Sequence, residues 1–328
     1  MVQGEKRSGA DGIGYATLLV RVNRFFLALR NALLRGLTAL WMALTRLLPP
    51  AVMVPPTLAV ARLVWWFYPR LRRIALTNLE LCFGDELPLR ERYRIARRSL
   101  EHLALTALEF MCFAHWPHEK VRSLALKVTG WEHFEEALTQ GKGVMVLGMH
   151  FGNWEFSGAF IPLSGVGLAA VGKEQVDDYF SALAFAIREK MQIENIPRAH
   201  RFSSSIVRAL RQNKVLGLLA DQNGGQDGCF VPFFGIPAST VRGPAALALK
   251  FGTPMMVVVA RRLAPFAFEF IVKPPLKLEL PDDSEAAEEA ILTAMNAAYE
   301  AVIREEPEQW LWIHQRFKTR PQGEESLY

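Results

Sequence analysis

The chain has 328 residues, of which 51% are hydrophobic and 22% are charged. This composition excludes an intrinsically disordered protein, and the mean hydropathy of +0.11 is high enough for a membrane-associated one. A length about twice that of a ~150-residue domain fits one large domain or two modest ones. Cys82, Cys112 and Cys229 are far apart and form no CxxC pair, which argues against a disulfide scaffold and a structural zinc site.

The net charge of +5 is distributed unevenly along the chain. Residues 1–78 contain eleven lysines and arginines and two acidic residues, a net charge of +9, so the other 250 residues carry −4. Apolar residues dominate from 13 to 68, but the longest uncharged run, 47–61, has 15 residues and includes four prolines. Because a membrane-spanning helix needs about 20 apolar residues, we expect this segment to lie at the membrane surface.

A long amphipathic helix is predicted from 24 to 48, ending at Pro49. Arg24, Arg35 and Arg46 are spaced by 11 residues, which returns a helix to within about 20° of the same direction, so they form a basic stripe. Together with a broad face of Leu, Phe and Trp, the stripe favours an interfacial helix that binds anionic lipid. Packing of the apolar face on the protein's own core remains an alternative. Arginines interrupt the apolar stretch and no small-residue cleavage site follows, so we do not expect a cleaved signal peptide.

Strands and helices alternate along the rest of the chain. Helical patterns occupy 89–113, 132–139, 178–191, 203–211, 243–251 and 282–304. Short apolar or alternating runs predict strands at 144–149, 168–172, 215–220, 255–260 and 266–272. The alternation predicts an α/β fold with helices on both faces of a central sheet, whose ligands gather at the carboxyl ends of the strands. We therefore expect a membrane-associating segment at 1–77 and an α/β catalytic domain at 78–328.

His150 is the one histidine that directly follows a predicted buried strand and has a carboxylate close by. Glu155 lies five residues later, and five helical steps rotate a side chain by about 140°, so the two side chains can meet only across a turn. Gly152 frees the backbone there, and Asn153 is a good N-cap for a helix that begins at Trp154. Because a carboxylate on one ring nitrogen raises the basicity of the other, the pattern predicts a general-base dyad.

Alternatives to this dyad remain open at this point. A lone histidine after a strand is often structural. A metal site is disfavoured, because the HExxH spacing is missing and no second His or Cys lies nearby. The sequence contains no GxSxG nucleophile elbow and no GxxxxGK[ST] phosphate loop, and Gly141 to Gly143 precede their strand instead of following it, unlike a dinucleotide fingerprint. We expect no metal ion and no cofactor.

The segment HFGNWE at 150–155, after GKGVMVLGM, resembles the H-x4-D/E motif of the late acyltransferases of lipid A biosynthesis, the lauroyl and myristoyl transferases. Further blocks agree in order: NLELCF at 78–83, the stretch from 220–222 through 230–235, and PEQWLWIHQRF at 307–317. Together they extend the resemblance from about residue 19 to residue 321. It implies a mixed sheet like that of glycerol-3-phosphate acyltransferases.

The resemblance also implies an activity and a location. We expect an enzyme on the cytoplasmic face of the inner membrane of a Gram-negative bacterium. It would transfer a lauroyl or myristoyl chain from acyl carrier protein or coenzyme A to a hydroxyl of a lipid A precursor. The expected partners are this donor, the lipid A precursor or another glycolipid, and an anionic membrane surface, with no nucleic acid.

The family's site residues are carried over by position. His150 would remove the proton of the acceptor hydroxyl, with Glu155 holding the imidazole and no acyl-enzyme formed. Arg188 matches a family arginine near the dyad and is the expected donor to the oxyanion. Asp221 and Gln222 end a predicted strand at the same sheet edge, as supports or as acceptor contacts.

Other candidates come from the later blocks. The candidates are Phe230, Phe233 and Phe234 for an acyl channel, Arg316 and Lys318 for an acceptor phosphate, and Trp310 and Trp312 for an interface with lipid headgroups. An aromatic stripe is also typical of a core, and basic residues near a chain end are often simply solvated.

The chain departs from the family at one loop. Where relatives often carry an R-P-x-x-N-like sequence, this chain has KEQVD at 173–177. Lys173, a candidate substrate contact, lacks the bidentate geometry with which arginine binds phosphate, so the acceptor's identity stays open, phosphatidylinositol mannosides included. A hydrolase that passes the acyl chain to water and a noncatalytic lipid-binding protein also remain as alternatives. Acylation of lysophosphatidate is disfavoured because an FPEGTR-like block is missing.

Overall fold

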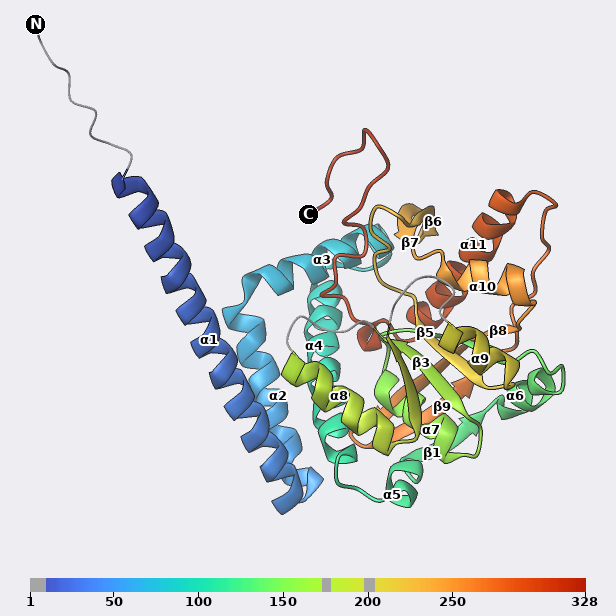
Figure 1. Ribbon diagram of the computed structural model, residues 1–328, viewed down its shortest axis with the longest axis horizontal. Helices are drawn as coiled ribbons and strands as arrows, with labels where there is room; N and C mark the ends of the chain where they lie inside the picture. The colour runs from blue at the N-terminus through green and yellow to red at the C-terminus, as the bar shows by residue number, and fades with distance from the viewer. Residues whose placement is uncertain (1–9, 173–177, 198–203) are drawn as a thin grey trace, which may run out of the picture. The chain divides into compact units, whose positions relative to one another are not determined.

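The computed structural model describes residues 10–172, 178–197 and 204–328 (Figure 1). The chain forms two compact units that divide between Pro49 and Pro50. The described part of the first unit contains helix α1 (Ala10–Leu47), which ends before Pro49 as predicted but begins well before residue 24. By packing, α2 (Pro50–Phe67) and α3 (Pro69–Phe83) belong to the second unit. The boundary drawn at residue 77 for membrane association stays a prediction.

The second unit alternates helices and strands. Its further helices are α4 (Leu89–Phe113), α5 (His118–Arg122), α6 (Trp131–Leu138), α7 (Trp154–Leu163), α8 (Asp178–Lys190), α9 (Ser204–Arg211), α10 (Gly243–Phe251) and α11 (Ser284–Glu305), with 3-10 turns η1 (Gly84–Glu86) and η2 (Pro307–Gln309). Its strands are β1 (Ala125–Thr129), β2 (Val144–Gly148), β3 (Leu168–Gly172), β4 (Ile193–Pro197), β5 (Val215–Leu219), β6 (Cys229–Phe233), β7 (Ile236–Thr240), β8 (Met255–Ala264) and β9 (Ala267–Val272).

Seven of these strands form one mixed sheet in the order β1-β9-β8-β2-β5-β3-β4. Strands β8, β2, β5, β3 and β4 are parallel, whereas β9 runs antiparallel to β8 and parallel to β1. Strands β6 and β7 form a separate hairpin. The predicted α/β fold with a mixed central sheet is confirmed.

The sheet separates two apolar cores, and alternate residues of β2 enter each. Met145 and Leu147 pack in the core that also holds α9, α10 and α11, while Val144 and Val146 pack in the core with α6, α7 and α8. Because both faces are covered, the central strands are apolar along their whole length, which is what made them recognisable in the sequence.

Four strands were not predicted, and each carries a weak apolar signal. Strands β1 and β4 lie at the two edges of the sheet and contain polar residues such as Lys127 and Glu194. Strands β6 and β7 contain Pro232 and Pro237 and are joined at Phe234 and Gly235, which both have positive φ, of 51° and 75°. Proline is compatible with such a short, separate hairpin but obscures a strand pattern.

Helix α2 continues through Pro55 and Pro56, within the run whose prolines had argued against a membrane span. Within the described ranges it is the one helix long and apolar enough to cross a membrane, judged by length and composition alone. At its end Trp66, Phe67 and Tyr68 are exposed by 70%, 75% and 61%.

Asn78 joins α3 to the C-terminal segment. Its side chain is fully buried, and its Nδ2 donates to the carbonyl oxygens of Trp312 and His314, at 2.7 Å in each case. Tyr328 Oη donates to its Oδ1. Two blocks that stand far apart in the sequence, 78–83 and 307–317, therefore meet around one amide.

Candidate active site

The parallel pairing of β2 with β5 brings His150 to Asp221. Gly148 at the end of β2 lies opposite Leu219 at the end of β5, so the chain reaches the same edge of the sheet two residues after each strand. There the Nδ1 atom of His150 lies 2.8 Å from Asp221 Oδ1, and the backbone N–H of His150 donates to Asp221 Oδ2 at 2.8 Å. Trp310 Nε1 donates to the same Oδ2 at 2.8 Å.

These contacts set the charges of the pair. Burial would raise the pKa of Asp221, but the charge of His150 and the hydrogen bonds from His150 and Trp310 hold it below its usual value. Burial would lower the pKa of His150, but the charge of Asp221 and its hydrogen bond raise it. In the neutral ring Nδ1–H donates to Asp221, so Nε2 carries the lone pair. Gln222 Nε2 lies 3.4 Å from that atom.

Glu155 does not hold the imidazole, so this expectation from the sequence is wrong. Both its oxygens face Arg188: Nε donates to Oε2 at 2.9 Å, and Nη2 donates to Oε1 at 2.5 Å. The two side chains are largely buried, with exposed fractions of 11% and 21%. Burial would lower the pKa of Arg188, but the charge of Glu155 and its hydrogen bonds raise it, so the guanidinium stays charged.

His150, backed by the buried Asp221, and the Glu155–Arg188 pair lie at one cavity of about 1080 Å³. His150, Trp154, Glu155, Arg188 and Gln222 contribute polar groups and rings to its wall. Much of the remaining lining is apolar and includes Ile161, Leu168, Ile193, Leu218 and Leu247. A cavity of this size lies just above the usual range of ligand sites, about 300–1000 Å³.

His314 supports the backbone beside the pair, a role that the sequence did not indicate. Its Nε2 accepts a hydrogen bond from the backbone N–H of Asn223 at 3.0 Å. Burial lowers the pKa of His314 to about 4, so the ring is neutral near pH 7 and can accept this bond. The sequence feature that could have pointed to this role is the block at 307–317, which contains both His314 and Trp310.

Comparison with known proteins identifies the family. The family described as bacterial lipid A biosynthesis acyltransferase matches residues 22–319. The chain belongs to this family. It is 31% identical over 267 residues to the lipid A biosynthesis palmitoleoyltransferase of Escherichia coli strain K12, with 80% of this chain and 83% of that protein covered.

Two further relatives extend the comparison. The lipid A biosynthesis lauroyltransferase of the same strain is 26% identical over 298 residues, covering 89% of this chain and 93% of the relative. A phosphatidylinositol mannoside acyltransferase of Mycobacterium tuberculosis is 27% identical over 143 residues, covering 42% and 45%. The protein is thus an acyltransferase, and the two Escherichia coli relatives are named for lipid A biosynthesis.

Three candidates from the tail of this acyltransferase are buried. Arg316 is fully buried and donates to Ser239 O at 2.5 Å and to Thr240 Oγ1 at 2.8 Å, so the expectation that it meets an acceptor phosphate is wrong. Burial lowers its pKa to about 10. Trp310 and Trp312 are only 2% and 0% exposed, so they form core and not an interface with lipid headgroups. Lys318 is exposed.

The three phenylalanines proposed for an acyl channel do not line the cavity described above. Phe233 is fully buried and packs against Trp310, with ring centroids 5.7 Å apart. Phe234 packs against Phe83 at 5.3 Å, and Phe230 lies on the same β6–β7 hairpin. They belong to the hairpin and the core beneath it. Lys173 lies outside the described residues.

From the geometry of the turn that carries His150, we predict that position 152 tolerates no side chain. Gly152 has φ of +57°, and a Cβ there would lie 2.0 Å from the carbonyl oxygen of Ala260. We expect Gly152→Ala to lower the free energy of unfolding by more than about 3 kcal/mol, measured by denaturant titration in detergent. Gly141 also has positive φ, of +67°, but open space around it, so Gly141→Ala is the control and should lose only about 1 kcal/mol. Equal losses in the two variants would contradict the steric argument.

Proposed function

We propose that this acyltransferase transfers a lauroyl or myristoyl chain from acyl carrier protein or coenzyme A to a hydroxyl of a lipid A precursor. The observation that carries the proposal is the His150–Asp221 pair at the wall of the cavity, with Nδ1 engaged at 2.8 Å and Nε2 left as the base. The family and two relatives, named for lauroyl and palmitoleoyl transfer, support acyl transfer in lipid A biosynthesis.

The proposed reaction is a direct transfer. His150 Nε2 takes the proton of the acceptor hydroxyl while the hydroxyl oxygen attacks the thioester carbonyl, and Asp221 stabilises the imidazolium that forms. Arg188 stabilises the oxyanion: Glu155 engages Nε and Nη2, so Nη1 is the donor that we assign to it. The intermediate then collapses, the carbon–sulfur bond breaks, and the thiolate takes the proton from His150. No acyl-enzyme is formed.

We further propose that the protein acts at the cytoplasmic face of the inner membrane. In the second unit, exposed Trp66 and Phe67 end the apolar helix α2, exposed Tyr68 follows them, and Arg70 and Arg73 lie on α3. Aromatic residues followed by arginines are typical of the boundary between bilayer and water, with the basic side toward the cytoplasm. In the first unit, the stripe of Arg24, Arg35 and Arg46 would add attraction to anionic lipid.

A mass-spectrometric assay tests the transfer. Protein purified in detergent is incubated with lauroyl-, myristoyl- and palmitoleoyl-acyl carrier protein and a tetra-acylated, Kdo-bearing lipid A precursor. We expect the wild type to add one acyl chain and His150→Ala to lose about 10³-fold in rate. The control is His133→Ala, on α6 outside the cavity, with an unchanged rate.

The same assay separates the alternatives. Release of free fatty acid without acylation of the lipid contradicts the proposal and indicates a hydrolase. An intact donor with no lipid product also contradicts it, and phosphatidylinositol mannoside, the acceptor class in the name of one relative, becomes the next acceptor to test.

The pH dependence tests the role of Asp221. Because the reaction needs neutral His150 and the pKa of His150 is raised, kcat/KM should fall as the pH drops through a midpoint above the ordinary value of about 6.5. In Asp221→Asn the carboxylate charge is lost, so the midpoint should move to lower pH while the plateau falls by about 10²–10⁴-fold. Asp227→Asn, a carboxylate elsewhere on the cavity wall, is the control and should keep the midpoint. An unshifted midpoint in Asp221→Asn would remove Asp221 from the proposed mechanism.

Vesicle binding tests the basic stripe. Replacement of Arg24, Arg35 and Arg46 by Gln should weaken binding to anionic vesicles by about 3 kcal/mol at low salt, since each arginine near the surface contributes about 1 kcal/mol. Binding should also become less sensitive to salt. A control with the same change in charge replaces three exposed residues of the second unit, Arg122, Arg211 and Lys277. Equal weakening in stripe and control variants would refute a specific role of the stripe.

A further inference from the structure

A buried ion pair lies behind the turn that carries His150. Glu109 of α4 is fully buried, and Arg262 of β8 is 6% exposed. Arg262 Nη1 donates to Glu109 Oε1, and the same oxygen accepts the backbone N–H of Phe266 at 2.9 Å. Burying two charges is costly unless each is fully hydrogen-bonded, so a pair at this depth calls for a reason beyond stability.

Glu109 fixes the orientation of the amide that caps α7. Its second oxygen, Oε2, accepts a hydrogen bond from Asn153 Nδ2 at 2.7 Å. This contact turns Asn153 Oδ1 toward the helix, where it accepts the backbone N–H of Phe156 at 2.8 Å. The carboxylate therefore decides which end of the Asn153 amide faces the first turn of α7, the turn that carries Glu155.

Arg262 holds the residue before Asn153. Its Nη2 lies 3.4 Å from the carbonyl oxygen of Gly152, and Thr106 Oγ1 donates to the same oxygen at 2.9 Å. The backbone N–H of Gly152 donates to the carbonyl oxygen of Gln309 at 3.0 Å. The side chain of Gln309 in turn bonds both backbone groups of Arg262, at 2.8 Å and 3.0 Å.

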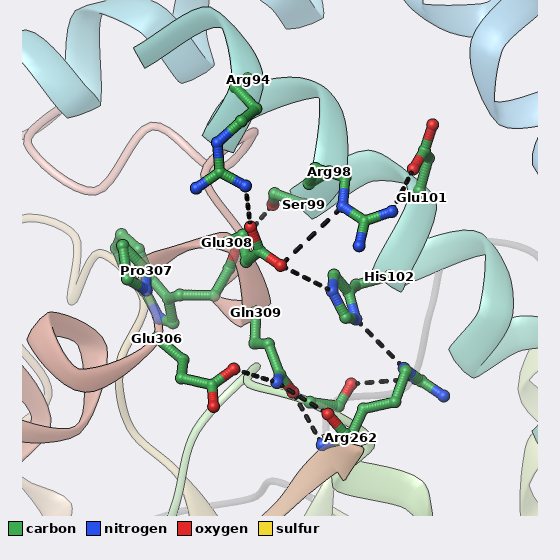
Figure 2. Close-up of polar contacts among 12 residues, drawn as sticks. Arg94, Arg98, Ser99, Glu101, His102, Arg262, Glu306, Pro307, Glu308 and Gln309 are labelled. Carbon is green, nitrogen blue, oxygen red and sulfur yellow. Dashed lines mark hydrogen bonds and ion pairs between the residues drawn. The ribbon is translucent and has the colours of Figure 1, made fainter. Parts of the chain in front are cut away.

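His102, in an outer layer of polar side chains, holds Arg262 in place. Figure 2 shows side chains of α4 converging on Glu308 and Arg262, with His102 between them. Arg262 Nε donates to His102 Nδ1 at 3.1 Å, and Glu308 accepts from Arg94 at 2.6 Å. His102 and Arg94 lower the pKa of Glu308 to about 2, so this carboxylate stays ionised.

We propose that Glu109 and Arg262 are positioning residues for acyl transfer: through Asn153 and Gly152 they fix the turn that places His150 and Glu155 at the cavity. The inference rests on the proposed role of His150 as the base. Neither side chain lines the cavity, so neither touches the substrate in this assignment.

Two single variants test the Glu109–Asn153 contact. In Glu109→Gln the new amide nitrogen faces Asn153 Nδ2, so two donors meet and the Asn153 amide must turn away from Phe156. In Asn153→Asp the cap is kept, but two carboxylates meet. For each we expect kcat to fall about 10–100-fold because the reacting groups are displaced. KM for the acyl donor should change less than about twofold, since the apolar lining of the cavity away from the turn is unaltered.

The double variant Glu109→Gln with Asn153→Asp is the decisive measurement. There the amide nitrogen introduced at position 109 donates to the carboxylate introduced at position 153, whose other oxygen again caps Phe156, and the cluster keeps its net charge. We expect kcat to recover to within about fivefold of the wild type, a coupling that a double-mutant cycle reports directly. The midpoint of the pH profile should stay unchanged in all three variants, because Asp221, Glu155 and Arg188, the charged groups that set the pKa of His150, are all retained.

Glu269→Gln is the matched control. Glu269 is 3% exposed and pairs with Lys127 and Arg261, and its hydrogen bonds are with Thr129 and Arg261, not with residues of the turn. It should lower the melting temperature and leave kcat unchanged. Single variants with wild-type kcat, or a double variant no more active than the product of the two single losses, would overturn the proposal. A wild type without acyl transfer would instead overturn the proposed function.

Discussion

The register between β2 and β5 is the constraint on which the site depends. It places the residues two positions beyond each strand at the same edge, where His150 and Asp221 meet at 2.8 Å. A shift of one residue in either strand would turn its side chains to the other face. Close packing on both faces opposes that shift, because side chains of different size would have to exchange between the two cores. The chemistry of the site is thus tied to the packing of the sheet.

The buried carboxylate of Asp221 explains why distant segments converge here. A carboxylate only 1% exposed needs donors to replace water, and it receives them from the backbone and ring of His150 and from the indole of Trp310. Trp310 reaches it from the chain end, where Asn78 also anchors the neighbouring carbonyl groups. None of these groups separates His150 from the cavity that it lines. The groups that bury Asp221 therefore leave His150 accessible from the cavity.

Whether a feature could be predicted from the sequence depends on how far apart along the chain the residues that determine it lie. The central strands, most helices and the turn at Gly152 were predicted, because apolar runs, caps and glycine act locally. The partner of His150 was not, since Glu155 is five residues away and Asp221 is 71, and strand pairing alone selects between them. Arg316 was misassigned because its type suggests solvent, whereas its partners, Ser239 and Thr240, lie on a hairpin that the pattern did not reveal.

The spacing of the H-x4-E motif takes on a different meaning in this geometry. Because Asn153 begins α7 between them, His150 stays on the strand side of the turn while Glu155 lies in the first helical turn and faces Arg188. The two carboxylates therefore have separate partners: one holds an imidazole and the other holds a guanidinium. Each partner bonds both oxygens of its own carboxylate. In this chain the motif forms a turn with the proposed base, His150, before it and Glu155, which anchors Arg188, after it.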